Sequence, residues 1–162
     1  MKRSQARSAL AQLDRALRRA ERSRPRKRSQ YFIPSLWTDP TGSPRRLRVD
    51  PYAFYRGIVR KIRRASPLRR KKGRTGGGEW TREAVIYNMF VRTTAAFDHN
   101  GNGRLDLQPG PGDFRETGTF LKALAMLPYI KGLGADTVHL LPVTSIGHDG
   151  NKGTLGSPYA IR

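Results

Sequence analysis

GTFLKALAMLPYIKGLGADTVHLLP, residues 118–142, is the stretch of this 162-residue chain that decides its fold. Its first half predicts a helix, because Thr117 or Thr119 can act as the N-cap and Glu116 suits the positive end of the helix dipole. Apolar residues then recur at the spacing of one broad helical face. They are Phe120, Leu121, Leu124, Leu127 and Ile130.

The second half of the stretch predicts a tight turn and a buried strand. Gly132 and Gly134 supply the unhindered backbone that ends a helix and reverses the chain. Residues 137–141 are β-branched or large and mostly apolar, as in a buried strand. An upstream strand is predicted at residues 84–91 (AVIYNMFV), so the order is strand, helix, strand. This order predicts a βαβ unit with parallel strands and a right-handed crossover.

Three segments together resemble the start of the catalytic barrel in the α-amylase family of glycoside hydrolases. They are VIYNMFV at 85–91, the stretch at 118–143, and GSPYAIR at 156–162. The family has a first strand with a tyrosine near its start, a glycine-led helix, and a strand that ends in proline. The positions that match this pattern are Leu127, Tyr129, Ile130, Lys131, Leu133, Gly134 and Pro142.

The resemblance implies an α/β fold, namely the first β-α-β portion of a (β/α)₈ barrel preceded by a basic helical N-terminal extension. A whole barrel takes about 250 residues, so we expect residues 79–162 to be an incomplete barrel in a truncated product. The family cleaves or transfers α-glucosidic linkages with carboxylates on later strands. We therefore expect an α-glucan or oligosaccharide substrate for the complete enzyme, catalytic carboxylates beyond Arg162, and an inactive chain when alone.

Two residues near the end of the chain are predicted to lie close to substrate. Tyr159 falls where the family has a tyrosine that stacks on the sugar ring, although the local sequence here is Ser-Pro-Tyr-Ala. His148 lies in the loop at the C-terminal end of the second predicted strand, the edge at which barrel active sites form. His139, inside that strand, is predicted to be a packed core residue.

The loop after the first strand predicts a calcium site. Residues 98–106 read DHNGNGRLD, which matches the opening of a calcium loop, D-x-[DN]-x-[DN]-G. The expected ligands are Asp98, Asn100, Asn102, the Arg104 carbonyl and Asp106. Pro109 stands where an EF-hand has a bidentate glutamate, so the loop is not a standard EF-hand. Some α-amylase relatives bind structural calcium at this place; the alternative is a polar Asn-Gly turn without an ion.

The formal charge of +20 is confined to the first half of the chain. Residues 1–75 hold 24 Lys and Arg against four acidic residues, whereas residues 76–162 hold eight of each. We therefore predict a basic helix and linker at 1–30, a helical extension with a Gly-rich basic linker at 31–78, and the barrel segment at 79–162.

The basic half has two interpretations. Residues 3–23 and about 51–65 predict amphipathic helices, the second with Asp50 as N-cap and Phe54, Ile58 and Ile62 as its apolar stripe. Either the leucines at 10, 13 and 17 dock the first helix on the rest of the protein, or the arginines bind nucleic acid or anionic lipid.

Cysteine is absent, and no apolar run has the length of a signal peptide core or of a transmembrane helix. These features predict a cytoplasmic protein without disulfides.

Overall fold

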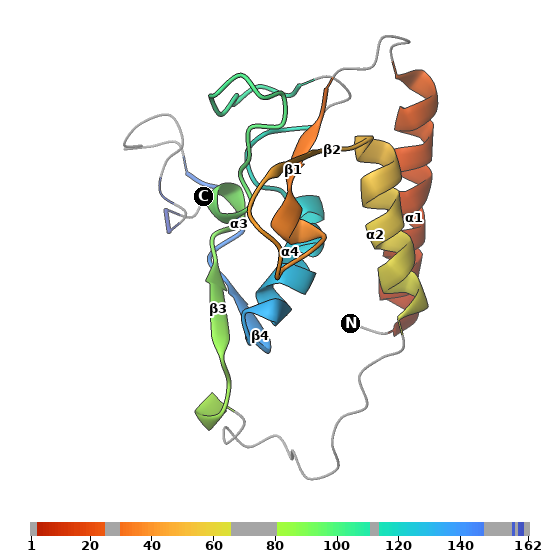
Figure 1. The fold of residues 1–162 in the computed structure, drawn as a ribbon. Helices are drawn as coiled ribbons and strands as arrows, with labels where there is room; N and C mark the ends of the chain where they lie inside the picture. The colour runs from red at the N-terminus through yellow and green to blue at the C-terminus, as the bar shows by residue number, and fades with distance from the viewer. Residues whose placement is uncertain are drawn as a thin grey trace.

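The computed structural model describes residues 3–24, 30–65, 81–110, 114–147, 157 and 159–160 (Figure 1). Within these residues the chain is a mixed α/β structure of helices and two small sheets. The elements are α1 (Arg3–Ser23), β1 (Phe32–Pro34), the 3₁₀ turn η1 (Ser35–Trp37), β2 (Arg46–Arg48), α2 (Pro51–Arg64), β3 (Ile86–Met89), α3 (Val91–Thr94), α4 (Phe120–Gly132) and β4 (Thr137–Leu140).

The predicted βαβ unit is confirmed. β3 pairs with β4 in parallel, with Ile86 opposite Thr137 and Met89 opposite Leu140. Helix α4 connects them, and the Thr119 side chain caps its start by accepting a hydrogen bond from the Lys122 N–H at 3.3 Å. Gly134 has a φ of +87°, the left-handed conformation expected after the helix.

The first strand is shorter than predicted. Residues 84–91 were expected to be extended, but β3 ends at Met89 and the short helix α3 begins at Val91. The Phe90 carbonyl accepts hydrogen bonds from the Thr93 and Thr94 N–H groups, so the chain leaves the sheet there. β3 and β4 are the strands of the parallel sheet among the described residues, and the complete (β/α)₈ barrel stays a prediction.

The parallel sheet is packed on one face. Tyr87, Met89 and Val138 contribute to the core, whereas Ile86 and His139 are exposed. The prediction that His139 is a core residue is therefore wrong for the described structure. Residues alternate between the two faces of a strand, and His139 lies on the face that the described residues leave uncovered.

Helices α1 and α2 have the predicted extents and lie side by side in opposite directions (Figure 1). As predicted, Asp50 caps α2 by accepting a hydrogen bond from the Ala53 N–H at 3.1 Å. In α1, Leu17 is buried, and Leu10 and Leu13 pack against the core. The leucines thus dock α1 on the protein.

The buried face of α2 differs from the expected stripe. Tyr52, Tyr55 and Val59 are buried, whereas Phe54 and Ile58 are only partly buried. The reason is the position of α2 between α1 and α4, because contacts on both sides centre its buried face on Tyr55 and Val59, next to the expected stripe.

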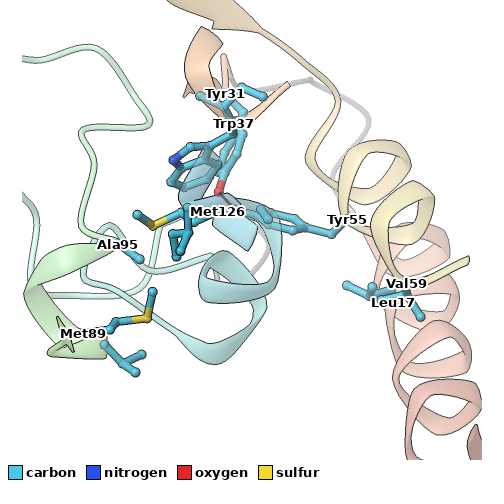
Figure 2. Close-up of a cluster of buried hydrophobic side chains, with 12 residues drawn as sticks. Leu17, Tyr31, Trp37, Tyr55, Val59, Met89, Ala95 and Met126 are labelled. Carbon is cyan, nitrogen blue, oxygen red and sulfur yellow. Dashed lines mark hydrogen bonds between the residues drawn. The ribbon is translucent and has the colours of Figure 1, made fainter. Parts of the chain in front are cut away.

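An antiparallel hairpin of β1 and β2, which was not predicted from the sequence, completes the fold. Trp37, which follows β1, and Tyr55 of α2 turn toward Met126 of α4, as Figure 2 shows. The buried cluster extends from Leu17 to Ile130, so elements from both the basic extension and the βαβ unit build one core.

The linker predicted at 68–78 lies outside the described residues, as do residues 25–29 of the first linker. The proposed domain boundaries stay predictions. Among the helices that the structure describes, none is both long enough and apolar enough to cross a bilayer.

Candidate functional site

The loop from Asp98 to Asp106 is folded around the Asp98 carboxylate. Asp98 Oδ1 accepts hydrogen bonds from the N–H groups of Gly101 (2.7 Å) and Asn102 (3.2 Å), and Oδ2 accepts one from Gly103 (2.8 Å). Gly101 and Gly103 have φ values of +80° and +82°, which L side chains rarely adopt. The two glycines therefore allow the backbone to wrap around one carboxylate.

Asp98 is held in its charged form. Burial alone would raise its pKa, but hydrogen bonds from Gly103 and Gly101 and the positive charge of Arg46 outweigh it, so the pKa of Asp98 is lowered. The Arg46 guanidinium reaches Asp98 Oδ2 from β2, with 3.0 Å between Nη2 and the oxygen. Arg46 was not predicted as part of the site, because nothing local marks a partner 52 residues away.

The remaining predicted side-chain ligands also lie together. The side-chain amides of Asn100 and Asn102 donate to Asp106 Oδ2 at 2.7 and 3.1 Å. Their own oxygens accept backbone N–H groups, from Asn102 and Arg104 respectively, at 2.9 and 2.8 Å. The structure thus brings the predicted residues into one hydrogen-bonded cluster.

Glu116 anchors this cluster from the next segment of the chain. Its side chain is buried and accepts hydrogen bonds from three backbone N–H groups. His99 and Asn100 donate to Oε1 at 2.9 and 3.0 Å, and Asp106 donates to Oε2 at 2.8 Å. Glu116 was expected only beside a helix start; its side chain instead closes the loop.

Lys122 of α4 lies next to Glu116, and its ammonium group is buried. Nζ donates to the carbonyl oxygens of Glu116 and Thr117, both at 2.9 Å. Burial lowers the pKa of Lys122 to about 7, although the Glu116 charge partly opposes this. Lys122 was not singled out from the sequence, because the sequence does not show the carbonyl groups around it.

His99 ties the loop to β1. Its carbonyl accepts a hydrogen bond from the Phe32 N–H at 2.8 Å, and its ring stacks on Tyr31 with centroids 4.2 Å apart. Burial, with the nearby charge of Lys122, lowers the pKa of His99 to about 4. The imidazole is thus neutral at pH 7 and belongs to the core of the loop.

The donor set fits calcium by chemistry, because carboxylate, amide and carbonyl oxygens are the ligands that calcium prefers. Its charge balance is less favourable, since Arg46 neutralises Asp98 and each Asp98 oxygen already accepts two hydrogen bonds. Among the described residues, no group of three or more acidic, His or Cys side chains is arranged for a metal. The calcium site stays a prediction.

The residues expected near a sugar are only partly described. Tyr159 is 68% exposed, and its N–H donates to Ser157 Oγ at 3.3 Å. The Gly147 N–H donates to the Ala160 carbonyl at 2.8 Å, which brings this end of the chain back to the loop after β4. His148 lies outside the described residues.

A second polar pair lies on the uncovered face of the parallel sheet. His139 Nδ1 and Asn88 Oδ1 are 2.9 Å apart, so β4 and β3 are joined by side chains as well as by backbone. Asn88 was not singled out from the sequence. It lies beside His139 because the register of the two strands pairs these residues.

The chain is similar to characterised enzymes over part of its length. It is 39% identical over 74 residues to the α-1,4-glucan:maltose-1-phosphate maltosyltransferase of Mycobacterium tuberculosis (strain H37Rv), a match that covers 46% of this chain and 9% of that enzyme. It is 36% identical over 73 residues to the oligo-1,6-glucosidase of Bacillus sp. (strain F5), with coverages of 45% and 11%. No protein-family model matches. The matched segments span about a tenth of these relatives, which by name are enzymes that act on glucans or glucosides.

Proposed function

We propose that residues 79–162 form the opening β-α-β unit of an α-amylase-type (β/α)₈ barrel, in an enzyme that acts on α-glucosidic linkages. The parallel pairing of β3 and β4 through α4 is the observation that carries the proposal. The partial matches to the maltosyltransferase and the oligo-1,6-glucosidase support the substrate class.

The exposed apolar residues are consistent with a larger barrel. Phe120, Leu127 and Leu133 of α4 and its C-cap are 56%, 41% and 55% exposed, and Ile86 on β3 is 53% exposed. Isolated exposed apolar residues are ordinary, but here they gather on the one βαβ unit. Further strands and helices of a barrel would cover these side chains.

The chemistry in this proposal needs two carboxylates, one as nucleophile and one as acid/base, about 5–5.5 Å apart for a retaining enzyme. Asp98 and Glu116 are unsuited to either role, because backbone N–H groups occupy their oxygens. We assign the catalytic carboxylates to barrel strands outside residues 1–162.

The described residues would shape the site instead. In a (β/α)₈ barrel the loops after the strands form the active-site face. Glu116 holds the loop after β3 in one conformation, and the exposed ring of Tyr159 can stack on a sugar. We also propose that His148, which lies outside the described residues, contacts the same sugar, and that calcium is a structural ligand of the 98–106 loop.

The proposal is tested on the protein expressed with all coding sequence downstream of codon 162. We expect an Asp-Tyr pair and further βα units in that sequence, and release of glucose or transfer products from maltotetraose. Residues 1–162 alone should give no turnover. Tyr159→Ala should lower kcat/KM about tenfold, whereas Tyr159→Phe, which keeps the stacking ring, should stay within about twofold. A downstream sequence without βα units, or a full product inert toward α-glucosides, would make the proposal wrong.

A further inference from the structure

A pocket of about 500 Å³ lies between helices α1 and α2, which lie side by side (Figure 1). The two helices run in opposite directions, so the start of α1 lies beside the end of α2. The described residues that line the pocket are Arg7, Asp14, Arg18, Arg60, Arg63 and Arg64. Five guanidinium groups therefore share one cavity with one carboxylate, which leaves an excess of four positive charges.

The Asp14 carboxylate is the centre of this arrangement. Asp14 is only 4% exposed and lies within ion-pair distance of four arginines. Arg18 and Arg56 are 3.2 and 3.4 Å away, whereas Arg60 and Arg63 are each 3.9 Å away. One carboxylate has about four lone-pair sites and cannot satisfy four guanidinium groups that carry five N–H donors each.

The arginines nearest the opening keep donors for another anion. The side chains of Arg18, Arg60 and Arg63 are 49%, 45% and 41% exposed. Arg56 is different, because Glu21 and Asp14 both pair with it and its side chain is only 16% exposed. The charge of Arg56 is thus balanced by Glu21 and Asp14, whereas an excess of positive charge remains at the pocket.

We infer that this pocket binds a small, multiply charged phosphate anion. The planar guanidinium fork matches the geometry of phosphate oxygens, and several forks around one cavity favour an anion with more than one phosphate charge. A volume of about 500 Å³ lies in the range of small-molecule sites, about 300–1,000 Å³. Such an anion would also relieve the mutual repulsion of the five arginines.

The surroundings favour a small anion over a polymer or a membrane. No aromatic side chain lies among the described residues that line the pocket, so bases have nothing to stack on there. Leu10, Leu13 and Leu17 of α1 face the core of the protein, so the helix does not offer an apolar face to lipid.

The experiment titrates the full 162-residue chain with sodium pyrophosphate by calorimetry, at low and at physiological ionic strength. We expect saturable binding of one pyrophosphate per chain and a rise in the midpoint of thermal unfolding, because a ligand that binds only the folded state stabilises it. Arg60→Gln/Arg63→Gln should weaken binding by about tenfold or more, since two charge-assisted contacts are lost.

The matched control is Arg45→Gln/Arg48→Gln, which removes the same charge from exposed positions on and beside β2. It should change the affinity by no more than about twofold. Asp14→Asn should tighten binding, because it removes the only negative charge among the described residues of the lining; a purely structural role for Asp14 would not produce this gain. Circular dichroism spectra confirm that each variant is folded.

Two results would overturn the inference. One is the absence of saturable pyrophosphate binding to the wild-type chain. The other is an equal loss of affinity in the two double variants, which would show that net charge alone attracts the anion. In that second case single-stranded RNA should also lose affinity equally in both variants, as in general polyelectrolyte binding without a discrete site.

Discussion

The Arg46 guanidinium lies 3.0 Å from the Asp98 carboxylate and so joins β2 of the basic extension to the loop after β3. Asp98 is the first expected ligand of the calcium loop, and the arginine brings a positive charge to the same oxygen that accepts the Gly103 N–H. The N-terminal extension thereby influences how strongly the loop can attract a cation.

Replacing Arg46 should strengthen calcium binding. In Arg46→Gln the loop loses one positive charge, so calcium should bind several-fold more tightly than in the wild-type chain. The measurement is the calcium-dependent rise in the midpoint of thermal unfolding, with Arg48→Gln as the control for net charge. Equal calcium responses in wild type, Arg46→Gln and Arg48→Gln would contradict a role for Arg46, and Asp98→Asn should abolish the response.

Removing Glu116 should open the 98–106 loop. Glu116→Ala leaves the N–H groups of His99, Asn100 and Asp106 without their acceptor. Each lost bond to a charged group costs about 1.5–3 kcal/mol, so these amides should exchange with solvent at least about tenfold faster. Hydrogen exchange measures this directly. Asp136→Ala, at an exposed position, is the control and should leave the three amides unchanged.

Gly118 should not tolerate a side chain. A Cβ at this position would lie 1.7 Å from the Val91 carbonyl oxygen, and the Gly118 N–H donates to the Arg92 carbonyl at 2.7 Å. The backbone segments would have to separate, so Gly118→Ala should lower the free energy of unfolding by more than about 4 kcal/mol or prevent folding.

The matched control for that substitution lies in helix α2. A Cβ at Gly57 would meet no atom within 4 Å, and alanine favours a helix over glycine by about 0.5–1 kcal/mol. Gly57→Ala should therefore raise the stability in urea unfolding. Similar losses for the two variants would show that the close approach at Gly118 is not the cause.

Lys122 should make stability depend on pH above neutrality. Its pKa is about 7 in the folded chain against an ordinary value of 10.5, so the unfolded chain binds more protons between these values. The free energy of unfolding should then rise with pH across this window, by about 1.4 kcal/mol per pH unit at most. The cost of burying the charge is fully present below pH 7.

Lys122→Met removes this titrating group. Urea unfolding of wild type and variant at several pH values between about 6 and 9.5 isolates the contribution of Lys122 as the difference in slope. The slope should be smaller in the variant, whatever the loss of the two hydrogen bonds from Nζ does to its absolute stability. Equal slopes would show that Lys122 keeps an ordinary pKa.

Local sequence signals predicted the helices and the parallel strand pair well. Asp50 and Thr119 are capping residues with side chains that bond the first turn, and the glycine at 134 adopts the expected left-handed conformation. Such signals involve residues only a few positions apart, so they can be recognised in the sequence without knowledge of tertiary contacts. Element bounds were less accurate, as at Phe90, whose carbonyl accepts the Thr93 and Thr94 N–H groups, so that β3 ends at Met89.

The partners of the candidate site could not be predicted in the same way. Arg46 and Glu116 both bind the 98–106 loop, but Arg46 lies 52 residues from Asp98, and Glu116 lies 10 to 17 residues from the groups that it contacts. The motif specified which loop residues converge, and the surrounding fold specified which charges meet them. The hairpin of β1 and β2 was missed for a similar reason, because its strands have three residues each and carry no alternation of apolar and polar residues long enough to recognise.

The position of Glu116 also has a consequence for protein synthesis. A ribosome makes the chain from the N-terminus, so the loop at 98–106 emerges before the glutamate that closes it. Until Glu116 and then Lys122 have left the exit tunnel, the amides of the nascent loop remain bonded to water. Closure of this loop on the ribosome therefore follows the exit of Glu116, and a translation pause that holds Glu116 inside the tunnel after Asp106 has emerged would leave the loop open to proteases and chaperones.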